Sequence, residues 1–185
     1  MKLGSLAACV LLAVLPAACT AMSTYPPVDG KPISTPNVSP GPEVMAGAIR
    51  EASRQVAPGK PIVFNLPDGL SENTWNRVAF LLPDSARAME PEDEDVYSVK
   101  QLRISGGIAE VDVVYRDRGV YQLMTVKLNG GPLAGWSVAW SYRWLLPEQK
   151  PMPNDPLQKA EMAQVNETAP AASTTKASDD EDNVK

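Results

Sequence analysis

The segment VYSVKQLRISGGIAEVDVVYRDRGVYQLMTVKLNGGPLAGWSVAWSYRW, residues 96–144, determines the class of fold. In it apolar and polar side chains alternate in four runs, and glycine-containing stretches at 105–107, 116–119 and 129–132 separate these runs. Alternation with a period of two is typical of half-buried strands, and short glycine-containing stretches between strands are typical of hairpin turns. The segment therefore predicts a four-stranded antiparallel meander.

The last of these runs contains three of the four tryptophans of the chain. Strict alternation places five large side chains on one face of this strand, namely Trp136, Val138, Trp140, Tyr142 and Trp144. Ser141 and Arg143 fall on the opposite face, which we expect to meet solvent. An aromatic stripe can be a stacking platform for a sugar or a lipid, but it is more often the side that faces the core. We therefore expect Trp136 and Trp140 to be buried, and Trp140→Ala to cost ~3–5 kcal/mol as a core truncation.

Two helices are expected before the meander. The first begins at Pro42, because proline is favoured at the first helical position, and ends before Pro58. Its apolar face repeats at helical spacing and consists of Met45, Ile49, Ala52 and Val56. The second follows Ser71, whose hydroxyl suits an N-cap, and ends at Pro83, with a short strand over 61–64 between the helices. One face of a meander must be covered, so the sequence predicts an α+β fold in which two N-terminal helices pack on a four-stranded antiparallel meander.

The first residues of the chain have the three-part layout of an export signal. Lys2 supplies a positive charge, residues 3–15 are almost all apolar, and the small residues Ala17 and Ala18 follow them. The apolar run is too short to span a bilayer, which requires ~20 apolar residues. We therefore expect residues 1–18 to be a signal peptide that is removed on export.

Residues 15–19, LPAAC, resemble the lipobox of bacterial lipoproteins, in which a Leu-like residue and two small residues precede an invariant cysteine. The resemblance implies that Cys19 is the lipidated first residue of the mature chain, held in a membrane of the cell envelope by lipid such as palmitate. Pro16 departs from the pattern, because the family prefers a branched apolar residue at this position. The resemblance also implies an outer-membrane address if the source is Gram-negative, since Thr20 and not aspartate follows the cysteine.

Two other interpretations of the N-terminus stay open. Residues 6–9, LAAC, match the letters of a lipobox better, but they leave a hydrophobic region too short for export. Ordinary signal cleavage after Ala21 would instead release the chain without lipid. One cysteine in an exported chain otherwise lacks a purpose, which favours lipidation of Cys19.

The two ends of the mature chain differ in composition from its middle. Residues 19–42 are rich in proline, serine and threonine, and they predict an extended tether between the lipid and the domain. Residues 148–185 begin with prolines and finish in an acidic run, and they predict a disordered acidic tail. The folded domain is then expected over 43–147.

The composition argues against several kinds of active site. The chain has no histidine, and its two cysteines are Cys9 and Cys19, so the folded domain has no imidazole base and no thiolate. A net charge of −5 argues against a nucleic-acid partner. The acidic run 90–95 lacks the glycine of a calcium loop, and Glu110 and Asp112 share a strand face without an identifiable pocket. We therefore predict no catalytic residue, no metal and no cofactor.

Two helices followed by an antiparallel sheet that ends in Gly135-Trp136-Ser137-Val138 resemble the nuclear transport factor two-like superfamily. The resemblance implies a cone-shaped fold, and this superfamily includes both enzymes and binding modules. The favoured function is a membrane-anchored envelope lipoprotein with a small non-enzymatic binding domain, whose partner is an envelope protein or a small apolar ligand. The alternatives are a carboxylate-dependent hydrolase or isomerase with a cone-shaped pocket, and an envelope assembly or structural factor.

Overall fold

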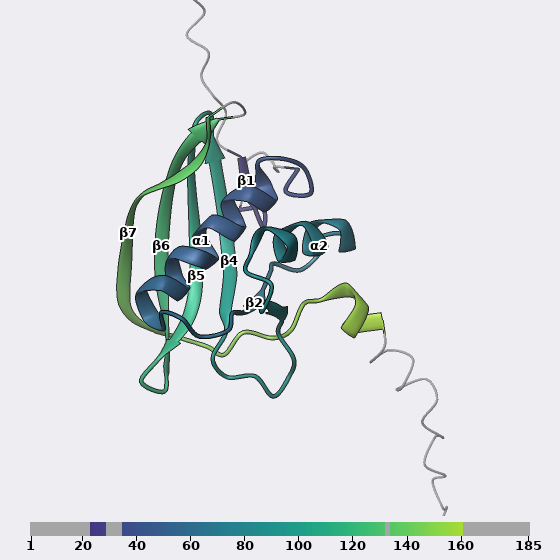
Figure 1. Ribbon diagram of the computed structural model, residues 1–185, viewed down its shortest axis with the longest axis vertical. Coiled ribbons are helices and arrows are strands. Elements are labelled where there is room, and N and C mark those ends of the chain that lie inside the picture. The colour runs from purple at the N-terminus through teal and green to yellow at the C-terminus, as the bar shows by residue number, and fades with distance from the viewer. Residues whose placement is uncertain (1–22, 29–34, 132–133, 161–185) are drawn as a thin grey trace, which may run out of the picture.

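The computed structural model describes residues 23–28, 35–131 and 134–160 as one body of two helices and seven strands (Figure 1). The elements in chain order are β1 (Ser23–Tyr25), α1 (Gly41–Val56), β2 (Val63–Asn65), α2 (Glu72–Leu81), β3 (Arg87–Ala88), β4 (Tyr97–Ser105), β5 (Ile108–Asp117), β6 (Val120–Gly131) and β7 (Gly135–Glu148). The fold class is α+β, as the sequence predicts, with both helices packed on a mostly antiparallel sheet. None of the helices in these residues is long and apolar enough to cross a bilayer.

The sheet is built around the meander β4–β5–β6–β7, whose neighbouring strands all pair antiparallel. The full strand order is β3-β2-β4-β5-β6-β7, and β1 pairs with the part of β4 that β2 leaves free. The expected strand near residues 61–64 is β2, and it pairs parallel with both β3 and β4. The sequence predicted neither β1 nor β3, because strands of three and two residues carry too few alternating positions to be recognised.

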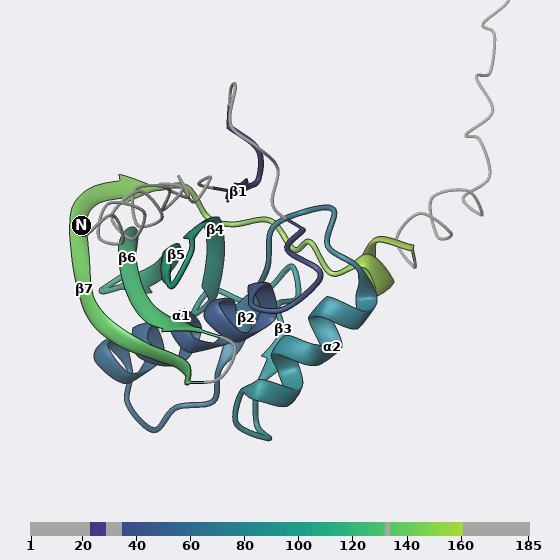
Figure 2. The ribbon, with the colours of Figure 1, turned by 90° about the horizontal axis from the view of Figure 1, so that it is seen from above.

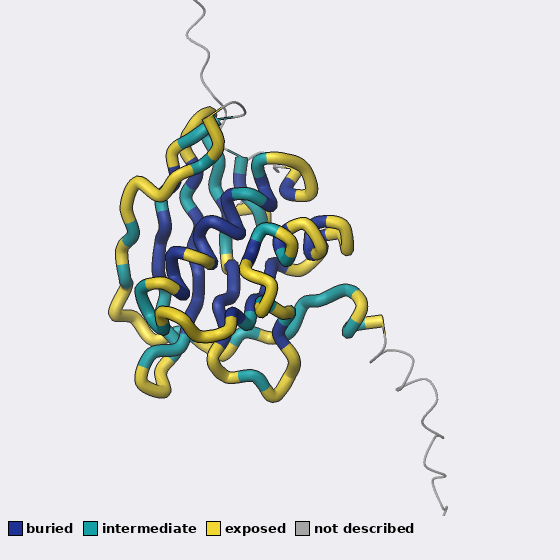
Figure 3. Tube along the Cα trace, in the orientation of Figure 1, coloured by how far each residue is buried: buried dark blue, intermediate teal, exposed yellow. Residues whose placement is uncertain are grey.

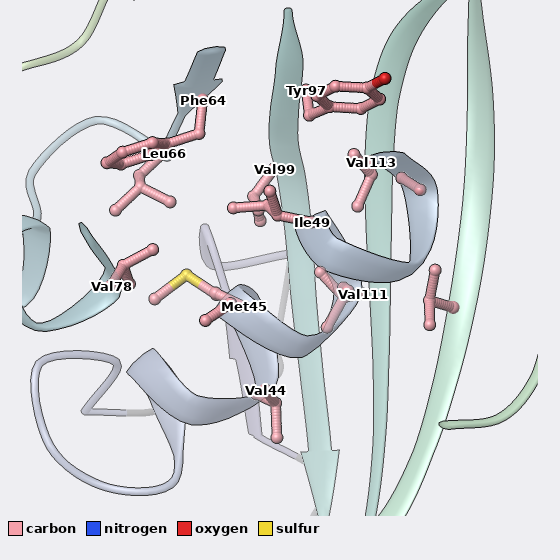
Figure 4. Packing of buried hydrophobic residues seen from close by; sticks show 14 of the residues in the cluster. Val44, Met45, Ile49, Phe64, Leu66, Val78, Tyr97, Val99, Val111 and Val113 are labelled. Carbon is pink, nitrogen blue, oxygen red and sulfur yellow. The ribbon is translucent and has the colours of Figure 1, made fainter. Parts of the chain in front are cut away.

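Helix α1 lies across one face of the meander, and we call this face the inner face (Figure 2). The helix has Pro42 in its first turn and ends at Val56, close to the expected bounds. Its buried side chains belong to the core, and they include Val44, Met45, Ile49 and Ala52. Ile49 lies against Val99 and Val111 of the inner face, whereas Met45 points toward Val78 of α2 (Figure 4). Helix α2 begins after Ser71, whose side chain accepts the Thr74 N–H as the sequence predicts.

The hydrophobic core lies between the helices and the inner face. Its strand residues alternate along β5 and β6 and are Ala109, Val111, Val113, Tyr115, Met124, Val126 and Leu128. Phe64 and Leu66 continue the core beyond β4 towards α2, where Trp75 and Val78 close it. Complete burial of one such aliphatic side chain stabilises the folded state by ~1.5–3 kcal/mol, so this core is the main source of stability.

The body extends beyond the expected domain of residues 43–147 at both ends. On the N-terminal side, Ser23–Tyr25 pairs with β4, so part of the expected tether belongs to the sheet. On the C-terminal side, residues 149–160 run past β2 and the loop that follows it, where the Asn65 amide donates to the Met152 carbonyl at 2.9 Å and Lys159 contacts Asp68 (Figure 1). The expected signal peptide, Cys9, Cys19 and the acidic end of the expected tail lie outside the described residues.

Candidate functional site

The candidate site is the outer face of the meander, the side that points away from α1 (Figure 2). Strand pairing brings polar and aromatic side chains from four strands together on this face, and they are Arg103, Glu110, Asp112, Thr125, Lys127, Trp140, Tyr142 and Trp144. The four strands are hydrogen-bonded neighbours, so their pairing fixes the spacing of these side chains along and across the face.

A β-bulge in β7 determines which side chains reach the outer face. Lys127 pairs with Trp140 and Leu128 pairs with Val138, so Ala139 is an extra residue on β7. One extra residue moves every following side chain to the other face of a strand. Trp136 and Val138 therefore lie on the inner side, whereas the aromatic residues after the bulge point outward.

The expectation of a single buried aromatic face on β7 is wrong beyond Ala139. Trp140, Tyr142 and Trp144 are 46%, 55% and 43% exposed, and β7 is largely exposed along its length (Figure 3). Trp136 is partly buried and packs against the core, so the expected burial of this residue is confirmed only in part. The predicted cost of Trp140→Ala, which assumed a core position, is wrong for the same reason.

The polar residues after the bulge face α1 and hold β7 to the last turn of that helix. Gln55 donates a hydrogen bond to the Ser141 hydroxyl, and Arg143 donates to the Gln55 carbonyl at 2.7 Å. The guanidinium carbon of Arg143 also lies 5.8 Å from the centre of the Tyr115 ring. The expectation that Ser141 and Arg143 meet solvent is therefore wrong, because both side chains form hydrogen bonds with Gln55 at the C-terminal end of α1.

A chain of hydrogen bonds crosses the outer face from β4 to β7. Arg103 donates two hydrogen bonds to the Asp112 carboxylate, at 2.7 and 2.9 Å. Thr125 donates to the same carboxylate at 2.6 Å, and the Trp144 indole N–H donates to the Thr125 hydroxyl at 2.9 Å. The hydrogen bonds to Asp112 raise the pKa of the Arg103 guanidinium further above its ordinary value. This chain fixes the orientation of the Trp144 ring.

We call Trp140, Tyr142 and Trp144 the aromatic row. The Lys127 ammonium lies 5.8 Å from the centre of the Trp140 ring, within the range of a cation–π interaction. The rings of Tyr142 and Trp144 meet edge to face, with centres 4.7 Å apart. Leu145, which follows directly, is 84% exposed. The aromatic row thus presents ring faces, ring edges and an adjacent aliphatic side chain to whatever contacts this edge of the sheet.

The carboxylates that the sequence suggested for chemistry are already paired. Glu110 and Asp112 both lie against Arg103 on the outer face, with the Glu110 carboxylate 3.5 Å from the guanidinium. In the acidic run, Asp93 accepts hydrogen bonds from Arg87 and from the Glu90 N–H. In the described part of the chain, no group of three or more acidic, cysteine or histidine side chains could hold a metal ion.

A groove of about 630 Å³ lies where the C-terminal segment crosses β4, and sequence patterns gave no sign of it. Lys100 and Glu148 face each other at 2.8 Å in its wall, and Asn65 lies beside them. Asn65 is almost fully buried and bonds to both Ser98 and the segment around Met152. The polar groups of the groove therefore hold the C-terminal segment in place.

Comparisons of the chain with protein-family models, with curated proteins and with solved structures found no match. The likenesses to the lipobox and to the nuclear transport factor two-like superfamily therefore stay expectations from the sequence.

Proposed function

We propose that this protein is a membrane-anchored envelope lipoprotein, lipidated at Cys19, whose domain is a non-enzymatic binding module. The outer face of the meander is its binding surface. The main support for a binding function is the aromatic row, in which three large aromatic side chains are about half-exposed on one face of one strand. Contiguous exposed apolar surface on a soluble domain marks an interaction site, and tryptophan and tyrosine are the residues that contribute most at such sites.

The arrangement of the outer face favours binding over catalysis. Arg103 forms ion pairs with both Glu110 and Asp112, and a carboxylate held in an ion pair is poorly placed to exchange a proton with a bound substrate. The alternative enzyme requires a cone-shaped pocket with an inward-pointing carboxylate, but the space between α1 and the inner face is filled by apolar side chains such as Ile49 and Ala52. The carboxylate-dependent enzyme is therefore the less supported function.

Metabolic labelling with palmitate tests the anchor. We expect the wild-type chain to incorporate label and Cys19→Ser to incorporate none, because serine at this position has no thiol to carry the diacylglyceryl group. Cys9→Ser is the matched control and should label like the wild type, since Cys9 is removed with the signal peptide. Equal labelling of wild type and Cys19→Ser would overturn the lipoprotein assignment.

A further inference from the structure

The distance between the proposed anchor and the folded body is short. Ser23 pairs with Ile104 in the sheet, so only three residues separate Cys19 from the first residue of β1. A fully extended chain spans ~3.3–3.6 Å per residue, so this connection reaches about 14 Å at most. The tether that the sequence suggests, from Cys19 to residue 42, would allow a wide separation between lipid and domain. The pairing of β1 removes most of that separation.

Strand β1 and the aromatic row lie at opposite ends of one row of paired residues. Across the sheet, Thr24 pairs with Arg103, Arg103 with Glu110, Glu110 with Lys127, and Lys127 with Trp140. Four strand spacings of about 4.8 Å place Trp140 about 19 Å from β1. Seen from above, β1 lies on the side of β4 away from the helices (Figure 2). Thr24 itself is buried, but Ser23, at the start of β1, is partly exposed, so a surface that contacts the aromatic row can also lie close to the start of β1.

We propose that the outer face lies against the membrane that holds the lipid anchor, with the aromatic row in the headgroup layer. This inference rests on the proposed lipidation of Cys19. Tryptophan and tyrosine concentrate at the boundary between lipid and water, because their rings are apolar and each has one polar group. Leu145 adds an aliphatic side chain at the same edge of the sheet.

The charges on the outer face indicate which lipids are required. Arg103 and Lys127 carry two positive charges, and Glu110 and Asp112 carry two negative charges within the same rows. The face is therefore close to neutral, and attraction to anionic lipid contributes little. Zwitterionic lipid headgroups should therefore be sufficient for the contact. The lipid anchor keeps the outer face at a high effective concentration near the bilayer, so even a weak interaction between the face and the headgroups would be occupied.

A second copy of the chain is a less suitable occupant of this edge. Pairing between two β7 edges would require a regular row of free backbone groups. The bulge at Ala139 and a second irregularity, where Leu123 pairs with Trp144 and Gln122 with Pro147, interrupt that row. Bulges on an edge strand act against pairing with another chain.

Quenching of tryptophan fluorescence by brominated lipid tests the contact. The full lipidated chain is placed in vesicles of phosphatidylcholine and phosphatidylethanolamine whose acyl chains carry bromine close to the headgroup. We expect clear quenching of the wild type relative to vesicles without bromine. The variant Trp140→Phe/Trp144→Phe should lose most of the quenched signal, whereas Trp75→Phe, which removes the buried tryptophan of α2, should keep it.

Each outcome decides the inference. Absence of quenching in a chain that incorporates palmitate overturns the membrane contact and leaves the proposed lipoprotein standing. Equal quenching in wild type and Trp140→Phe/Trp144→Phe overturns it too, because another part of the chain then meets the lipid. A lipidated chain that forms a dimer with unquenched Trp140 and Trp144 assigns the face to a second copy. Failure of palmitate labelling removes the proposed function itself.

Discussion

Trp75 and Trp140 have the same side chain in two different environments. Trp75 is 4% exposed and packs against Phe64, with ring centres 5.7 Å apart, whereas Trp140 is 46% exposed on the outer face. Trp75→Ala should therefore lower the free energy of unfolding by ~3–5 kcal/mol, and Trp140→Ala by about 1 kcal/mol or less. Urea unfolding of the two variants measures the difference. A larger loss for Trp140→Ala would contradict the placement of the bulge at Ala139.

Glu51 gives the protein a defined dependence of stability on pH. Arg54 donates two hydrogen bonds to its carboxylate, and they hold the pKa of Glu51 below its ordinary value of 4.5 although burial opposes this. The unfolded chain then takes up a proton at higher pH than the folded chain. The stabilisation of the folded state by ionised Glu51 is therefore fully present above pH 4.5, and it is lost as the pH falls through the lowered pKa of the folded state.

Urea unfolding of Glu51→Gln at several pH values checks this dependence. The variant should be less stable than wild type at pH 7, and the free energies of unfolding of the two proteins should converge once the pH has fallen below the lowered pKa of folded Glu51. Glu92→Gln is the matched control, because Glu92 is exposed and accepts no hydrogen bond from a described residue. If the free energies of unfolding of wild type and Glu51→Gln differ by the same amount down to acid pH, the ion pair of Glu51 with Arg54 does not cause the pH dependence.

At the scale of elements, the helices and the long strands could be predicted from the sequence, because helical spacing and strand alternation are patterns among residues close together in the chain. Helical spacing identified α1, and the Ser71 cap identified the start of α2. The sequence could not predict which side chains of β7 point outward. The bulge at Ala139 arises from the pairing of β6 with β7, and it does not change the alternation of apolar and polar residues in the sequence. The aromatic row was thus predicted as a set of residues but assigned to the wrong face.

The C-terminal segment after β7 packs on the folded body, which the sequence did not predict. Its prolines are typical of a tail, yet Asn65 binds the Met152 carbonyl and the Asn154 N–H, contacts that join residues far apart in sequence. A stop after Glu148 should lower the free energy of unfolding by about 2–4 kcal/mol, because buried polar groups of Asn65 lose their partners. A stop after Ala160 is the control and should leave urea unfolding unchanged. Equal stability of the two truncations would show that the segment contributes nothing.

At the scale of the whole molecule, the sheet determines how far the domain lies from its proposed anchor. The sequence predicted a tether to residue 42, because proline-rich composition indicates extended chain and says nothing about pairing with a distant strand. Ser23–Tyr25 instead forms an edge of the sheet beside β4. The same chain length that would keep a domain away from a membrane therefore holds this one against it, if lipid is attached at Cys19.

The intact mass of the mature protein, purified from the membrane fraction, tests the lipid anchor most directly. We expect a mature chain that begins at Cys19 and carries the mass of a diacylglyceryl group and a further acyl chain. Cys19→Ser should yield no such species. A mature chain that begins at Met22 and carries no added mass would contradict the account, because the protein would then be secreted without an anchor.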